Sequence, residues 1–134
     1  MTNSRNKGAS FEREIANILN DSLDLKKPLK RILEQTREKH LPDLILGKWC
    51  IECKRYGQGA EPLESWWDQV IKSTPEDSYP ALIYKFNHRP IKVRVPIHSV
   101  NRSLDKDFNH VCDFSMESFV ALLKSLYLED LSLI

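Results

Sequence analysis

Apolar residues near the start of the chain recur at the spacing of an amphipathic helix. In the stretch SFEREIANILNDSL, the apolar set is Phe11, Ile15, Ile18 and Leu19. Residues at these spacings share one face of a helix, so the pattern predicts a helix over residues 8–23. The following DLKKPLK contains a proline and predicts a connector.

Short runs of apolar or alternating positions predict strands in the rest of the first hundred residues. They lie at residues 29–36, 41–46, 49–55, 80–86 and 91–97. Gly47 and Lys48 supply the turn between the second and third runs, and NHRP supplies the turn between the last two.

Two further helices are predicted. The stretch LESWWDQVIKST, residues 63–74, has apolar residues at helical spacing, and a strongly amphipathic helix occupies about 115–130. Ser115 is a suitable N-cap for the second of them. Trp66 and Trp67 are adjacent, so we expect one of them in the core and the other partly at an interface.

The predicted order of elements is α-β-β-β-α-β-β-α, with no structure assigned to residues 98–110. This order indicates an α/β domain whose mixed central sheet is flanked by helices. A length of 134 residues suits a single domain, 1–134, with one hydrophobic core. The C-terminal helix has enough apolar surface either to cap the sheet or to pair with a second subunit.

The composition favours a soluble protein. Hydrophobic residues make up 41% and charged residues 29% of the chain, as in ordinary globular domains. No apolar run approaches the ~20 residues that span a bilayer, and the segment MTNSRNKGAS lacks the apolar stretch of a secretory signal. Three cysteines, an odd number, indicate free thiols. We therefore expect a cytoplasmic protein that does not enter a membrane.

Charge is distributed unevenly along the chain, although the net charge is only +1. Residues 1–60 contain 12 Lys and Arg against 8 Asp and Glu, whereas residues 61–134 contain 8 against 11. A basic first half predicts an anionic partner such as nucleic acid. Charge scattered over a solvated surface is the alternative explanation.

The stretch PDLILGKWCIECK places charged residues inside a predicted strand pair. Side chains alternate along a strand, so Glu52 and Lys54 share one face, while the apolar side chains between them face the core. Burying an unpaired charge costs several kcal/mol, so the Glu52 face is expected to line a cleft or to meet water. Asp43 lies before the first strand of the pair and can approach Glu52 if the register allows it.

Two converging carboxylates repel each other unless a cation lies between them. Mg²⁺ suits such a site because it takes oxygen ligands and often uses one or two carboxylates plus a substrate phosphate. Lys54 could neutralise the charge that develops at a phosphoryl group under attack by water. An exposed cross-strand charge pattern would give the same three residues, so this motif requires support from elsewhere in the chain.

Support comes from the order of four motifs. RNKGASFERE opens the first helix, PD and ECK lie on the strand pair, and WWDQ ends at Gln69 in the second helix. Together they resemble the archaeal-type and phage Holliday junction resolvases of the PD-(D/E)XK nuclease superfamily, over residues 4–96. The loop before Asp43 departs from the phage pattern, because EKHL stands where relatives have glycines.

The resemblance implies a restriction-endonuclease-like fold and a homodimer with two metal-dependent sites that make paired nicks in a four-way DNA junction. Glu12, Asp43 and Glu52 would bind Mg²⁺, with the Cys53 carbonyl as a further ligand and Mn²⁺ as a substitute. Lys54 would be the catalytic lysine. Gln69 would orient water or that lysine. The nicks would leave 5′-phosphates.

The resemblance also selects Glu12 over Glu14. Both acids flank the apolar stripe of the first helix, so geometry alone does not distinguish them. Basic residues that would surround the cleft and contact DNA phosphates are Arg5, Lys7, Arg13, Arg31, Arg37, Lys39 and Arg55.

The expected function is therefore a Mg²⁺-dependent, structure-specific DNA endonuclease, active in the host cytoplasm if a phage encodes it. Two alternatives stay open. One is a duplex-specific nuclease of the same superfamily, with a restriction- or repair-like role. The other is a non-catalytic DNA-binding module that keeps the nuclease fold.

Overall fold

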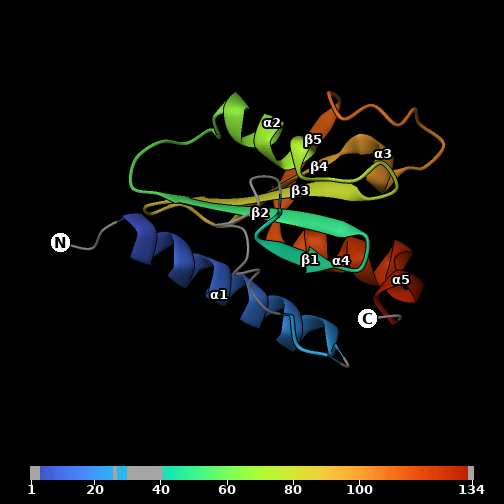
Figure 1. The fold of residues 1–134 in the computed structure, drawn as a ribbon, viewed down its shortest axis with the longest axis horizontal. Helices are drawn as coiled ribbons and strands as arrows, with labels where there is room; N and C mark the ends of the chain where they lie inside the picture. Colours follow the sequence, from blue (N-terminus) through green and yellow to red (C-terminus); the bar gives the residue numbers. More distant parts are fainter. Residues whose placement is uncertain (1–3, 26, 30–40, 133–134) are drawn as a thin grey trace.

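The computed structural model describes residues 4–25, 27–29 and 41–132, and these form a mixed sheet with helices on both faces (Figure 1). In chain order the elements are α1 (Ser4–Leu23), β1 (Leu44–Leu46), β2 (Trp49–Tyr56), α2 (Glu64–Lys72), β3 (Tyr79–Phe86), β4 (Lys92–Pro96), α3 (Ile97–Val100), β5 (Val111–Ser115), α4 (Met116–Leu126) and α5 (Leu128–Ser132).

The five described strands follow one another across the sheet in the order β1-β2-β3-β4-β5. Strands β2 and β3 are parallel, and the other three neighbouring pairs are antiparallel. The parallel pair needs a crossover, which α2 provides, because a tight turn can join antiparallel strands only. The predicted fold class, a mixed sheet flanked by helices, is confirmed.

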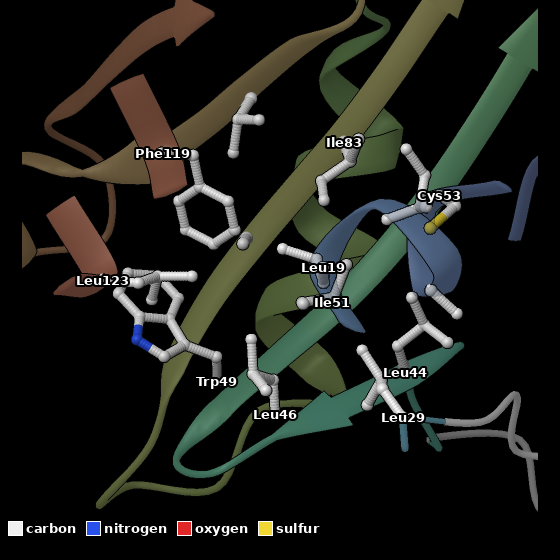
Figure 2. Packing of buried hydrophobic residues seen from close by; sticks show 14 of the residues in the cluster. Leu19, Leu29, Leu44, Leu46, Trp49, Ile51, Cys53, Ile83, Phe119 and Leu123 are labelled. Carbon is white, nitrogen blue, oxygen red and sulfur yellow. The ribbon is translucent and has the colours of Figure 1, made fainter. Parts of the chain in front are cut away.

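One face of the sheet carries the larger core, covered by α1, α4 and α5. Trp49, Ile51 and Cys53 of β2 point into this core together with Ile83 of β3 (Figure 2). Phe119 of α4 packs against Trp49 with its ring centroid 5.3 Å away. The predicted alternation along β2 is therefore confirmed, and it leaves Glu52 and Lys54 on the opposite face.

The opposite face of the sheet is covered by α2. Trp66, Trp67 and Val70 of this helix pack on Leu82, Tyr84 and Phe86 of β3. Both tryptophans are buried, so the prediction that one would lie at an interface is wrong. The reason is that the loop before β5 covers the second indole, whose N–H donates to the Phe108 carbonyl at 2.7 Å.

Several element boundaries differ from the predicted ones. Helix α1 begins at Ser4 rather than residue 8, and β1 begins at Leu44 rather than residue 41. The strand expected over 29–36 lies outside the described residues except for Leu29, which is in no strand but is buried in the larger core.

The sequence pattern did not predict α3 or β5. Helix α3 has only four residues, and a single turn is too short to show helical periodicity. Strand β5 is a half-exposed edge strand paired with β4 alone. Its core-facing residues, Cys112 and Phe114, are too few to give a clear alternating signal.

The C-terminal helix begins as predicted, because Ser115 is its N-cap and accepts a hydrogen bond from the Ser118 N–H at 3.1 Å. It ends at Leu126 rather than near residue 130. Tyr127 interrupts it and donates its hydroxyl to the Ser99 carbonyl at 2.6 Å, and α5 follows.

Helix α5 also contacts the turn between β1 and β2. The backbone N–H of Lys48 donates to an Asp130 carboxylate oxygen at 2.8 Å. Gly47 has a φ of +60° in this turn, a conformation that favours glycine. None of the helices described here is long and apolar enough to cross a membrane.

Candidate active site

The register of the first hairpin brings two acidic residues face to face. Leu44 pairs with Ile51 and Leu46 pairs with Trp49, so the next position of the same register sets Asp43 opposite Glu52. Asp43 also accepts a hydrogen bond at 2.8 Å from the backbone N–H of Cys53. This hydrogen bond fixes the Asp43 carboxylate, which lies just before the start of β1, against β2.

Three carboxyl groups are buried around this point. The exposed fractions are 3% for Glu52, 7% for Glu12 and 8% for Asp43. Burial raises the pKa of Glu52 to about 9, and the charge of Asp43 and a hydrogen bond with it act in the same direction. Lys54 lowers the Glu52 pKa, and Glu12 raises it. Asp43, Lys54 and Glu12 therefore all interact electrostatically with Glu52.

The structure distinguishes the two acids of α1 that the helical pattern could not separate. Glu12 is buried and interacts with both Glu52 and Cys53, whose thiol pKa is raised by burial and by the neighbouring acids. Glu14 is exposed. The acid that faces Asp43 and Glu52 is therefore Glu12.

A cavity of about 290 Å³ opens between β2 and α2. Glu52 lines the cavity from the strand side, and Gln69 lines it from the helix side. Because Gln69 is exposed on α2, its amide can reach a molecule that occupies the cavity. The cleft expected beside the Glu52 face of the strand is present.

Sequence reasoning missed other residues of α2 that line this cavity. They are Ser65, Asp68, Lys72 and, just beyond the helix, Ser73. Ser65, Asp68, Gln69 and Lys72 follow a spacing of three, one and three residues, which places them on one polar face of α2. This polar stripe, which lies opposite the buried tryptophans on the helix, is the sequence pattern from which these cavity residues could have been identified.

The predicted DNA-binding residues have different surroundings. Arg13 is exposed on α1 and donates to the Ser10 hydroxyl at 3.3 Å. Arg55 is half-buried, and its guanidinium donates to the Tyr56 carbonyl and to the Asn87 side chain, both at 2.7 Å. Arg5 and Lys7 belong to α1, but their side chains are not among the described ones. Arg31, Arg37 and Lys39 lie outside the described residues.

The donor chemistry of the acidic cluster fits a divalent cation. Asp43 and Glu52 supply carboxylate oxygens, and their mutual repulsion is the kind of strain that a cation relieves. Within the described ranges, no three Asp, Glu, His or Cys side chains are close enough to hold one metal ion together. An incomplete protein cage suits Mg²⁺, which keeps several waters and often needs only one or two carboxylates.

The raised pKa of Glu52 predicts an unusual pH dependence of stability in the absence of divalent cations. The pKa of about 9 in the folded protein lies above the ordinary glutamate value of 4.5, so between these pH values the folded chain holds a proton that the unfolded chain has lost. Stability should therefore fall as pH rises from about 5 to 9, by up to about 1 kcal/mol per pH unit. Urea unfolding at pH 6 and pH 8 in EDTA measures this slope.

The matched variant for this measurement is Glu52→Gln, which has no proton to lose at this position. Its unfolding free energy should change less between the two pH values than that of the wild type. Equal slopes for both proteins would contradict the assignment of the titration to Glu52.

A comparison with protein-family models matches residues 3–123 to the family described as "Phage putative PDDEXK endonuclease". The match contains the acid of α1, the PD and ECK motifs, α2 and the five strands of the described residues. A search of curated proteins and a search of solved structures gave no match.

Proposed function

The chain belongs to this family of phage PDDEXK endonucleases, and from that membership we propose a Mg²⁺-dependent endonuclease that resolves Holliday junctions and other branched DNA. The observation that carries the proposal is the facing pair Asp43 and Glu52, buried beside a cavity and interacting with Lys54. The enzyme acts as a homodimer, so that two sites nick opposite strands of one junction.

In this proposal Asp43 and Glu52 would hold the cation together with the Cys53 carbonyl, and Glu12 would act on the same acidic cluster from α1. When bound, the cation supplies Lewis-acid polarisation of the scissile phosphodiester. The hydrogen bond from the Cys53 N–H keeps Asp43 oriented toward β2, which reduces the reorganisation needed when DNA arrives.

Lys54 and Gln69 act on the reacting groups. The Lys54 ammonium neutralises charge that builds up on the phosphoryl oxygens, because it projects from the same strand face as Glu52. Gln69 reaches across the cavity from α2 and orients the attacking water. The water oxygen forms a bond to phosphorus as the bond to the 3′ oxygen breaks. The attacking water loses a proton, and the departing 3′ oxygen takes one up. The products are a 3′-hydroxyl and a 5′-phosphate.

Junction preference rests on the ordered set of motifs that begins with Lys7 and Gly8 and ends with Gln69. The test compares an immobile four-way junction with a linear duplex built from the same arms. With Mg²⁺ we expect paired nicks in the junction, and at least about tenfold slower cutting of the duplex, a difference of ~1.4 kcal/mol in activation free energy. With EDTA we expect no cutting of either substrate.

The same assay separates the competing functions. Equal cutting of junction and duplex would replace junction resolution by duplex-specific cleavage. Junction binding without Mg²⁺-dependent cutting would indicate a non-catalytic DNA-binding module. A sedimentation measurement that gives a monomer on the junction would contradict paired nicking by a homodimer.

A further inference from the structure

A second cavity, of about 300 Å³, lies over β3, β4 and β5 on the same sheet face as Glu52 and Lys54. Three cationic side chains line it: Arg89 and Lys92, which are exposed, and Arg94, which is half-buried. Glu61 and Asp113 also line it, so the charged lining has three positive groups against two negative ones.

Most of the negative charge of Asp113 is already engaged within the protein. Arg94 binds it with two hydrogen bonds, from Nε at 2.7 Å and from Nη2 at 3.1 Å. The Tyr84 hydroxyl donates to the same carboxylate at 2.5 Å. Burial raises the pKa of Tyr84, and its hydrogen bond with Asp113 acts in the same direction, so the phenol keeps the proton that it donates.

This network also orients Arg94. A guanidinium has five N–H donors in a rigid plane, and Asp113 takes two of them. The remaining donors are held in a fixed orientation at the cavity. An arginine held in this way is suited to a phosphate, whose oxygens accept two parallel hydrogen bonds.

The cavity begins on β3, the strand next to the one that carries the candidate catalytic lysine. Lys54 is in register with Tyr84, and Tyr84 is in register with Lys92. Two strand spacings separate the Lys54 and Lys92 backbones by about 10 Å. The phosphates of one DNA strand recur every ~3.4 Å along the helix axis, so a few nucleotides span both positions.

Backbone contacts join the two regions as well. Directly after β2, the Gly57 carbonyl accepts a hydrogen bond from the Asn87 N–H at 3.2 Å. Arg55, next to Lys54, donates to the Asn87 side chain. The turn from β3 to β4 and the loop after β2 lie at one end of the molecule, which is also the end where α1 begins (Figure 1).

We propose that the cavity lined by Arg89, Lys92 and Arg94 binds a backbone phosphate of the DNA strand, a few nucleotides from the phosphodiester at Lys54. This inference rests on the proposed nuclease function for its ligand. It adds a site on the β3–β4 hairpin to the basic residues around α1 and the first hairpin. The contact is independent of base sequence, because it is made to the sugar–phosphate backbone.

The double variant Arg89→Ala/Lys92→Ala tests the site. Both side chains are exposed, so the fold should be retained, as circular dichroism can verify. Binding of a labelled four-way junction is measured in EDTA over a series of salt concentrations. We expect the Kd to rise about tenfold near 100 mM salt. We also expect the slope of log Kd against log salt to fall by about 1 to 2 units.

The matched control is Lys48→Ala/Lys124→Ala, which removes the same charge from exposed positions on the turn before β2 and on α4. Its affinity and salt slope should match those of the wild type. An equal loss in both double variants would overturn the inference, because general charge and not the cavity would then be responsible. The charge reversal Arg89→Glu should weaken binding further than alanine does.

The design separates this inference from the proposed function. If the wild type binds junctions but never cuts them with Mg²⁺, the nuclease function fails while the binding data still test the cavity. If the wild type cuts junctions and Arg89→Ala/Lys92→Ala binds them normally, the cavity inference fails and the nuclease function stands. A wild type that binds no DNA would overturn both.

Discussion

Replacing Glu52 with glutamine should reduce Mg²⁺-dependent cleavage by about 10³-fold, comparable to the loss of one charge-stabilising group from a preorganised site. Glutamine keeps the shape of the side chain and removes the charge that would pair with the cation in the proposed mechanism. Glu52 is 3% exposed and faces Asp43 across the hairpin, so the substitution removes a charge from within the buried acidic cluster.

Loss of folding cannot account for this result, because the ionised form of Glu52 is unfavourable in the folded protein. Burial and the neighbouring acids raise its pKa to about 9, so a neutral side chain should leave the apo protein at least as stable. Single-turnover cleavage, junction binding and thermal unfolding are measured on the same preparation, with the exposed Glu76→Gln as the control. Cleavage by Glu52→Gln at the wild-type rate would remove the proposed mechanism.

The pair Glu12→Gln and Glu14→Gln should behave very differently although the two residues are only two positions apart. We expect Glu12→Gln to lower the cleavage rate by about 10²-fold, the upper range for residues that tune a metal site. Glu14→Gln should stay within about twofold of the wild type, because exposed substitutions of this kind have small effects. The structural reason is that Glu12 is buried against Glu52 and Cys53, whereas Glu14 is exposed.

A Mg²⁺ titration of the cleavage rate refines the role of Glu12. If this residue helps to hold the cation, Glu12→Gln should need a higher Mg²⁺ concentration for half-maximal activity. A lower rate at an unchanged Mg²⁺ requirement would instead place Glu12 in the positioning of DNA or water. Equal activity of the two α1 variants would contradict the site as described.

The core and the acidic pair could be predicted from sequence because both depend on local rules. Alternation along β2 separates Ile51 from Glu52, and a two-residue turn at Gly47 and Lys48 sets the register that brings Asp43 opposite Glu52. The choice of Glu12 required knowledge of which side of α1 faces β2. Helical periodicity leaves that open, since acids on either side of an apolar stripe look alike.

The second cavity escaped prediction because its parts are distant in sequence and individually ordinary. Lys92 and Arg94 alternate with valines on β4, which is also the pattern of a strand with one solvated face. Only the pairing of β4 with β5 brings Asp113 beside Arg94. That strand was not predicted, so the carboxylate that orients the arginine could not be placed.

Helix α5 is made late in synthesis, although it contacts a hairpin that is made early. Asp130 holds the turn before β2, and Tyr127 and Leu131 complete the core around Trp49. A ribosome adds roughly 5–20 residues per second, and it makes α5 after all five strands. The hairpin that holds Asp43 and Glu52 is therefore synthesised before the segment that braces it. We expect nascent chains that stop before Tyr127 to lack this brace and to be inactive, so that activity would appear only when synthesis of α5 is complete.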